Sequence, residues 1–162
     1  MAESVPLLAI FDIDGVVADV RHRLPHLARQ PKNWAGFFAA AHRDPPLAEG
    51  VALAREYGAT HHLVWLTGRP ERLRGVTVAW LAALDLPHEW LLMRPANDRS
   101  AARLFKERQI AYLGREARVD IVVDDDPDVV ARLRGAGWPV RHADWVPYRE
   151  PLRRAQERDG RT

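Results

Sequence analysis

Two short segments of the chain carry pairs of aspartates. Asp12 and Asp14 follow one apolar run, and Asp124 and Asp125 follow another. Carboxylates held close together repel one another, so they need a hard cation or a shared proton, and a site built from oxygen ligands suits Mg²⁺. In an extended segment, side chains two residues apart point the same way, so one carboxylate can attack phosphorus while the other handles the leaving-group proton. The spacing therefore indicates phosphoryl transfer through an aspartyl phosphate.

Apolar runs alternate with helical patterns along the chain. We expect strands over residues 5–11, 61–66, 91–93 and 119–123, and a last strand from residue 139. Helices are expected over residues 47–57, 101–113 and 129–133. A further helix should have Pro70 in its first turn and Val76, Trp80, Leu81 and Leu84 on one face. This alternation predicts an α/β fold, a Rossmann-like parallel sheet with helices on both faces. Ligands of such sheets bind at the carboxyl ends of the strands, so the aspartates, Thr67 and Arg69 should meet there.

Composition limits the class of protein. With 162 residues, 47% of them hydrophobic and 28% charged, the chain is typical of a soluble globular domain. We predict one domain over residues 1–147, with residues 19–46 as a small flap and residues 148–162 as a charged, frayed tail. The absence of cysteine excludes disulfides, thiolate zinc sites and cysteine nucleophiles. No apolar run approaches the roughly 18 residues that span a bilayer, and no leader pattern is visible, which predicts a cytoplasmic enzyme without a membrane partner.

Four segments match, in order and context, the motifs of a known enzyme group: Phe11–Gly15, Leu66–Arg69, Lys106 and Val123–Asp125. Over about residues 7–145 the chain resembles the haloacid dehalogenase (HAD) superfamily of phosphatases. The chain uses Arg at 22 of its 24 basic positions, so a lysine at the third motif favours a function for it.

This resemblance implies a role for each matching residue. It implies that Asp12 is the nucleophile and that Asp14 is the general acid and then the base. The phosphate would be held and neutralised by Thr67, Gly68, Arg69 and Lys106. The Mg²⁺ ligands would be Asp12, the Asp14 carbonyl and Asp124 or Asp125. Alignment on the strand favours Asp124 and Asp125 as the site pair, with Asp126 or Asp128 capping the next helix.

A narrower resemblance involves the short flap, Thr67–Glu71, Leu91–Arg94 and Asp124–Asp125. These segments are similar to the 3′-phosphatase domain of polynucleotide kinase-phosphatases. That similarity implies that Arg69 and a flap arginine, Arg23 or Arg21, contact the substrate phosphate. No Gly-x-x-x-x-Gly-Lys-Ser/Thr phosphate loop is present, which predicts a stand-alone phosphatase without a kinase half.

Substrate choice depends on the flap. About thirty residues between Asp14 and Leu47 suffice for a helical flap but not for a large lid, which predicts a fairly open site that admits large or polymeric phosphates. The flap contains basic and aromatic side chains that can track a phosphate backbone and stack a base: Arg21, Arg23, Lys32, Trp34, Phe37 and Phe38. The expected substrates are nucleic-acid 3′-phosphate ends or nucleotides. The aromatic residues can equally form only the core of the flap.

Other functional classes stay possible at this point. One is a phosphatase of a small non-nucleotide metabolite, whose site a neighbouring copy of the chain can close; the oligomeric state is left open by the sequence. Another is a non-catalytic binding module, against which the intact Asp12, Asp14, Thr67 and Lys106 argue. His22 and His26 have a spacing that zinc uses, but no third ligand is near in sequence, so we do not expect zinc. The side chains of Trp65, Trp80, Trp90, Trp138 and Trp145 are expected to pack in the core or at its edge.

Overall fold

A five-stranded parallel sheet forms the centre of the computed structural model, which describes residues 5–162. Its strands are β1 (Leu7–Phe11), β2 (His62–Pro70), β3 (Leu91–Arg94), β4 (Arg118–Asp124) and β5 (Val140–His142). They lie in the order β3-β2-β1-β4-β5 and all four pairings are parallel. The predicted Rossmann-like sheet is therefore confirmed.

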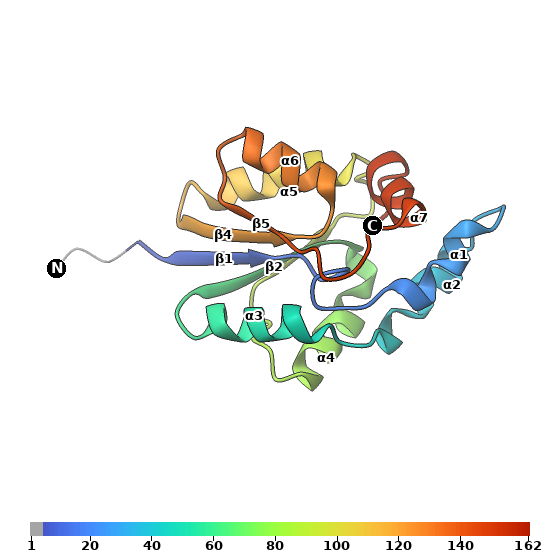
Figure 1. Ribbon diagram of the computed structural model, residues 1–162, viewed down its shortest axis with the longest axis horizontal. Helices are drawn as coiled ribbons and strands as arrows, with labels where there is room; N and C mark the ends of the chain where they lie inside the picture. Colours follow the sequence, from blue (N-terminus) through green and yellow to red (C-terminus); the bar gives the residue numbers. More distant parts are fainter. Residues whose placement is uncertain (1–4) are drawn as a thin grey trace.

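Helices cover both faces of this sheet, as Figure 1 shows. On one face lie α3 (Ala48–Gly58) and α4 (Arg74–Ala83), and on the other lie α5 (Ala102–Leu113) and α6 (Pro127–Gly135). The flap forms α1 (Pro25–Ala28), α2 (Trp34–Ala39) and the 3₁₀ turns Arg21–Arg23 and Ala41–Arg43 at the carboxyl end of the strands. A 3₁₀ turn over Glu71–Leu73 precedes α4, and α7 (Glu150–Arg153) continues into a π-helical turn over Arg154–Arg158.

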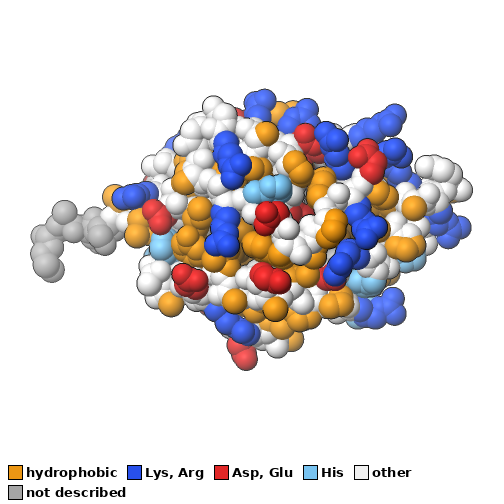
Figure 2. Space-filling view, viewed as in Figure 1, with side chains coloured by type: hydrophobic (Ala, Val, Ile, Leu, Met, Phe, Trp, Pro, Cys, Tyr) orange, Lys and Arg blue, Asp and Glu red, His pale blue; other side chains and the backbone are white. Residues whose placement is uncertain are grey.

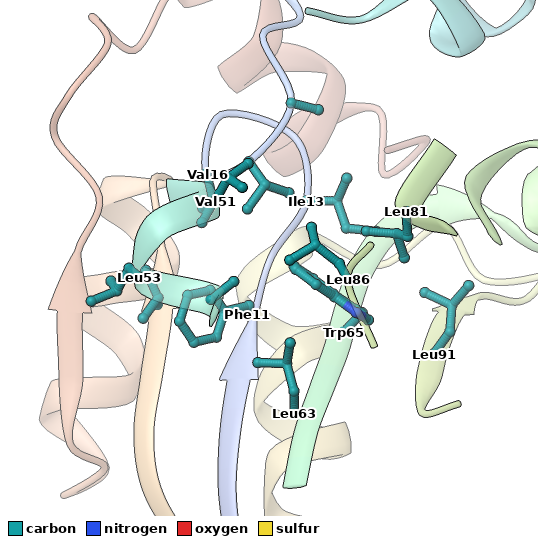
Figure 3. Close-up of a cluster of buried hydrophobic side chains, with 14 of the residues drawn as sticks. Phe11, Ile13, Val16, Val51, Leu53, Leu63, Trp65, Leu81, Leu86 and Leu91 are labelled. Atoms are coloured by element: carbon teal, nitrogen blue, oxygen red, sulfur yellow. The ribbon is translucent and has the colours of Figure 1, made fainter. Parts of the chain in front are cut away.

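Side chains of β1 alternate between two cores. Ala9 and Phe11 point to the face of α3 and α4, where Trp65 lies edge-on to Phe11 (Figure 3). Leu8 and Ile10 point to the face of α5 and α6. Because β1 is buried on both faces, its sequence is a continuous apolar run instead of an alternating one.

The region around Pro70 differs from the sequence expectation. Pro70 does not start a helix; it ends β2 and lies opposite Arg94 of β3. The helix begins at Arg74 and buries Thr77, Trp80 and Leu81, whereas Val76 is 38% exposed. Trp80, Leu81 and the partly buried Leu84 thus lie on the expected face, and only Val76 is misplaced. Its neighbour Thr77 is buried instead and accepts a hydrogen bond from Arg69. The expectation for Trp90 was also wrong, since its side chain is 56% exposed.

The C-terminal residues 148–162, which we call the covering segment, are folded. The predicted frayed tail was wrong: Leu152 and Ala155 are buried against Phe37 and Phe38 of the flap. Apolar residues three apart in a charged stretch are enough to anchor one helical turn on an apolar neighbour. The covering segment therefore belongs to the folded unit, while the domain limits drawn from the sequence stay a prediction.

Within residues 5–162 no helix is long and apolar enough to cross a membrane.

Candidate active site

The chain turns sharply where β1 ends at the carboxyl edge of the sheet. The backbone N–H groups of Val16, Val17 and Ala18 all donate to the Ile13 carbonyl. Gly15 has a φ of +80°, and a Cβ there would lie 1.9 Å from Asp125 Oδ2. Only glycine fits both the left-handed backbone and this close approach. The tight turn thereby brings the first acidic pair against the second.

A cluster of three carboxylates and one ammonium occupies this edge. Asp12, Asp124 and Asp125 place carboxylate oxygens within 4.8 Å of one another. Lys106 reaches in from α5, with its Nζ 2.9 Å from Asp12 Oδ2 and 2.5 Å from Asp124 Oδ2. Each of these four side chains is at most 3% exposed. We call this group the Asp12 cluster, and its carboxylates outnumber its cation by three to one.

Burial sets the protonation of the Asp12 cluster. It raises the pKa of Asp12 to about 7, because the attraction of Lys106 offsets only part of the desolvation and the repulsion from Asp124. Burial and the charge of Asp12 raise the pKa of Asp125 well above its usual range. Burial opposes the charge on Lys106, but Asp12 and Asp124 outweigh it and raise the pKa of the ammonium. The carboxylates of this cluster have an excess of negative charge that a proton or a metal cation must offset.

The donor set fits magnesium. All the candidate ligand atoms are oxygens, as Mg²⁺ prefers. Among residues 5–162, Asp125 Oδ1 is buried without a hydrogen-bond donor, which is costly unless a cation takes that place. Asp126 is not part of the set, because its side chain accepts a hydrogen bond from the Asp128 N–H and caps α6. The fold therefore groups Asp124 and Asp125 with Asp12, and their role as metal ligands stays a prediction.

Thr67, Gly68 and Arg69 lie at the end of β2, beside the Asp12 cluster. Thr67 is buried, and its Oγ1 accepts a hydrogen bond of 3.2 Å from the Arg69 N–H. Gly68 lies against the backbone of Thr162, since a Cβ on Gly68 would come within 2.1 Å of the Thr162 carbonyl carbon. The loop thus forms one wall of the site, and the covering segment lies directly on it.

A second ionic group lies on the flap side of the turn. Arg69 Nη2 is 2.7 Å from Asp14 Oδ1 and 2.8 Å from Asp44 Oδ2. Arg23 Nε lies 2.8 Å from Asp44 Oδ1, and Arg23 Nη2 lies 3.3 Å from Asp14 Oδ1. All four side chains are buried. We call this group the Asp14 cluster, in which two guanidiniums balance two carboxylates.

The two arginines decide the charge state of Asp14. Burial alone raises its pKa, but Arg69 and Arg23 outweigh burial and lower the pKa of Asp14 below its ordinary value. Arg23 also lies over the Phe37 ring, 4.4 Å from its centroid, so the flap core positions the guanidinium. Asp14 is therefore an ionised carboxylate in this arrangement.

Sequence reasoning missed Asp44. It stands 21 residues from Arg23 and 25 from Arg69, and no local motif marks it. Its backbone carbonyl accepts a hydrogen bond of 2.9 Å from Trp80 Nε1, which ties the flap to α4. An aspartate just before two prolines looks like a turn residue in the sequence, so only its spatial neighbours reveal its role.

Of the flap residues selected from the sequence, Arg23 alone joins these clusters. Arg21 is exposed and pairs with Asp19 at 2.7 Å. Trp34 is half-buried and stacks on Phe38, with ring centroids 6.1 Å apart and an interplanar angle of 22°. Whether Arg21 or Trp34 contacts substrate stays a prediction.

Comparison with known proteins identifies the chain's relatives. The family model of the polynucleotide kinase PNKP phosphatase domain matches residues 6–144. The chain belongs to this phosphatase family. The expected membership in the HAD superfamily is thereby confirmed, and the chain is a phosphatase domain of that superfamily. Among curated proteins none matches the chain.

Solved structures with the same fold include other phosphatases and hydrolases. A chain of the Pnkp1/Rnl/Hen1 RNA repair complex aligns with a TM-score of 0.70 and 22% identity over 90% of this chain and 44% of that one. The class C acid phosphatase from Bacillus anthracis with tungstate bound gives a TM-score of 0.63 and 12% identity over 89% and 69% of the two chains. A haloacid dehalogenase-like hydrolase from Streptococcus pneumoniae gives a TM-score of 0.57 and 10% identity over 83% of each chain. The chain thus spans less than half of the length of that chain of the RNA repair complex.

The site of this HAD phosphatase is more covered than its short flap predicted. Asp12, Asp14, Thr67, Lys106 and their neighbours are each at most 3% exposed. The cover comes from both the flap and the covering segment, whose Thr162 is 2% exposed and accepts a hydrogen bond of 3.5 Å from Arg94 Nη2. Flap length alone therefore misjudged access, because the segment that completes the cover stands at the other end of the sequence.

Proposed function

We propose that this phosphatase is a magnesium-dependent phosphomonoester hydrolase that forms an aspartyl phosphate on Asp12 and acts on 3′-phosphate ends of nucleic acids or on nucleotides. The observation that carries the proposal is the Asp12 cluster, in which a buried carboxylate lies between an ammonium and two further carboxylates. Such a group is unfavourable without a cation and well suited to phosphoryl transfer once a cation is bound.

Asp12 and Asp14 share the chemistry between them. A carboxylate oxygen of Asp12 attacks phosphorus, the bond from phosphorus to the leaving oxygen breaks, and Asp14 donates a proton to that oxygen. A water molecule then attacks phosphorus and gives a proton to Asp14, which releases inorganic phosphate and restores the Asp12 carboxylate. Lys106 neutralises the phosphate oxygens and Thr67 holds them. Asp12, the Asp14 carbonyl and Asp124 or Asp125 would hold Mg²⁺, which would supply further neutralisation of that charge.

Asp14 must carry a proton before it can act as an acid. Arg23 and Arg69 now hold it ionised, yet both are expected to contact the substrate phosphate. We propose that an arriving phosphate, which offers more acceptor oxygens and more charge than one carboxylate, draws these guanidiniums away from Asp14. Their departure raises the pKa of Asp14 and prepares it as the acid. Asp44 keeps its ion pairs with Arg23 and Arg69 while their contacts pass from Asp14 to the phosphate.

Two findings bear on the substrate. The family match to the PNKP phosphatase domain and the likeness to a chain of an RNA repair complex support nucleic-acid ends. The burial of the site supports the other candidate, a small phosphate ester of a metabolite, because small substrates react in sites that exclude water. The two candidates differ in the size of group that must pass the flap and the covering segment.

A panel of phosphate esters separates them. We expect 3′-phosphorylated oligonucleotides and nucleoside 3′-phosphates to be hydrolysed with higher kcat/KM than sugar phosphates. A clear preference for sugar phosphates would discard the nucleic-acid assignment and leave the phosphatase standing.

Magnesium dependence is tested with a chelator on the same panel. Activity should vanish on chelation and return with Mg²⁺ but not with Zn²⁺, while Ca²⁺ should inhibit because its looser coordination spoils the in-line geometry. Activity that survives exhaustive chelation contradicts the metal-dependent mechanism.

A further inference from the structure

The covering segment meets the start of α6 at a group of three carboxylates. Asp126 is the N-cap of α6, Asp128 lies in its first turn, and Glu157 belongs to the covering segment. Each offers one carboxylate oxygen, and these oxygens lie within 4.8 Å of one another. Figure 2 shows mainly Lys and Arg side chains on the end of the molecule that carries the flap and the covering segment. The three residues, which we call the Asp126 cluster, therefore gather in surroundings that are otherwise basic.

Asp126 is fully buried, and its two carboxylate oxygens differ in their partners. Oδ1 accepts a hydrogen bond of 2.9 Å from the Asp128 N–H and so caps α6. Oδ2 is buried as well, yet it has no hydrogen-bond donor among residues 5–162. A buried carboxylate oxygen without a donor is unfavourable unless a proton or a cation lies against it. The free oxygen is thus an observation separate from the grouping of the three acids.

Glu157 faces Asp126 from the covering segment. Burial first, and then a hydrogen-bonding approach by Glu157 and the charge of Asp124, raise the pKa of Asp126 to about 9. The side chain of Glu157 is itself only 9% exposed. Ionised carboxylates are acceptors without a donor, so two of them at this distance repel each other. A positive group between them would turn the repulsion into attraction.

Two arginines offset part of this charge from the outside. Arg103 Nη1 lies 2.6 Å from Glu157 Oε2, and Arg153 Nε lies 2.9 Å from Asp128 Oδ2. Their side chains are 40% and 53% exposed, so water screens both ion pairs. Within residues 5–162 no guanidinium or ammonium donates to Oδ2 of Asp126. The innermost carboxylate of the Asp126 cluster therefore keeps an uncompensated charge.

A hard divalent cation fits this arrangement better than a shared proton. A proton links two carboxylates, whereas Ca²⁺ takes about six to eight oxygen ligands and Mg²⁺ about six, with water completing either set. All three side chains of the Asp126 cluster supply oxygens. The side chain of Asp128 is 30% exposed, which gives water a way in. The exposed guanidiniums of Arg103 and Arg153 are free to turn outward when a cation takes over their carboxylates.

We propose that Asp126, Asp128 and Glu157 form a second divalent-cation site, which takes Ca²⁺ or Mg²⁺ and fastens the covering segment to the start of α6. The site lies outside the Asp12 cluster and does not depend on the proposed function, because none of its members contacts the reacting phosphate. Its occupation stabilises the cover of the active site, since the same segment places Thr162 on Gly68.

Equilibrium dialysis of the full chain against Ca²⁺ counts the sites. We expect two ions per parent chain, one of them bound with a Kd on the order of 10⁻⁴ M at the Asp126 cluster. Glu157→Gln and Asp125→Asn should each lose one ion, and the double variant should lose both. Glu150→Gln is the matched control, because Glu150 is an exposed acid of the same segment that pairs with Arg154 at 3.3 Å. It should bind as many ions as the parent, and thermal melting checks that each variant is folded.

Trypsin then measures how firmly the covering segment is held. The segment contains five arginines at which trypsin can cut: Arg149, Arg153, Arg154, Arg158 and Arg161. At a Ca²⁺ concentration of about ten times the Kd, the undocked population should fall about tenfold, and the rate of cleavage should fall with it. Glu157→Gln should lose this protection and Glu150→Gln should keep it. Any protection that comes from an ion at the Asp12 cluster would persist in Glu157→Gln, so the difference isolates the second site.

Arg103→Gln separates the cation from the ion pair. It removes the partner of Glu157 and keeps all three carboxylates, so it should bind the same number of ions as the parent. Its covering segment should be cleaved faster without a cation but should still be protected by Ca²⁺. Equal behaviour of Arg103→Gln and Glu157→Gln would overturn the inference, because the ion pair alone would then fasten the segment.

The count on the parent is decisive even if a variant does not fold. A parent that binds one ion, and none in Asp125→Asn, has no second site and overturns the inference while leaving the proposed function intact. A parent that binds one ion, and none in Glu157→Gln, supports the second site and contradicts the cation at the Asp12 cluster instead.

Discussion

The Asp12 cluster and the Asp14 cluster lie on two sides of one turn, and their charges are balanced differently. In the Asp12 cluster three buried carboxylates face a single ammonium. In the Asp14 cluster two buried guanidiniums face two carboxylates. A buried group with excess charge is unfavourable until a ligand offsets it, whereas a balanced group holds itself together. The Asp12 cluster is therefore suited to bind a cation and a phosphate. The Asp14 cluster is suited to hold its own side chains in position.

The largest expected effect breaks the chemistry of the Asp12 cluster. Asp12→Asn removes the nucleophile and should lower kcat by more than about a thousandfold on every phosphate ester. The fold should persist, because the amide fills the same space. Asp85→Asn is the matched control, since Asp85 is exposed, lies in the loop after α4 and has a φ of 53° that Asn adopts readily. Near-parental turnover by Asp12→Asn would remove the aspartyl-phosphate mechanism.

Removing one carboxylate from each cluster sharpens the contrast. Asp44→Asn leaves two buried guanidiniums with one carboxylate and should lower the free energy of unfolding by about 3 kcal/mol. Asp125→Asn relieves repulsion in the metal-free Asp12 cluster and should raise the melting temperature in chelator while weakening Mg²⁺ binding. Melting curves with chelator and with Mg²⁺ measure both. Destabilisation of similar size in the two variants would show that charge balance does not distinguish the clusters.

The stability of the metal-free protein should depend on pH through Asp12. Its pKa rises from 3.8 in the unfolded chain to about 7 in the folded protein, so its contribution to stability is present at low pH and is lost as pH rises through about 7. Melting temperatures in chelator should therefore fall from about pH 4 to about pH 7 and then level off, and Mg²⁺ should restore them. Asp12→Asn should reduce this fall. Part of the fall should remain in Asp12→Asn, because the pKa of Asp125 is also raised and its contribution has the same sign.

The smallest expected effect concerns the flap. Trp34→Ala should weaken binding of an oligonucleotide 3′-phosphate by about 1 kcal/mol, the low end for base stacking, because Phe38 and Arg161 already lie against the ring. An aryl phosphate should be hydrolysed almost as before. Trp90→Ala, which removes an exposed tryptophan elsewhere, serves as the control. A loss of equal size on both substrates would show that Trp34 only packs the flap.

Local sequence patterns were enough to predict the parallel sheet and the edge of it that carries the site. Continuous apolar runs such as Leu7–Phe11 predicted buried parallel strands, because a strand covered on both faces has no polar side. The polar residues that end those runs, Asp12 and Asp124 among them, predicted the place of the site because parallel strands all end at one edge. Gly15 marked the turn. None of these inferences needs knowledge of a partner distant in the sequence.

Pairings between distant segments were decided only by the tertiary structure. Asp44 joins Arg23 and Arg69 across more than twenty residues, and its sequence context gives no sign of this. The covering segment looks like a frayed, charged tail until Leu152 and Ala155 meet the apolar side of the flap. Val76 was misplaced for the same reason, since periodicity says which residues share a face but not what covers that face. Charge and burial depend on neighbours in space, and the chain brings those neighbours together only when it folds.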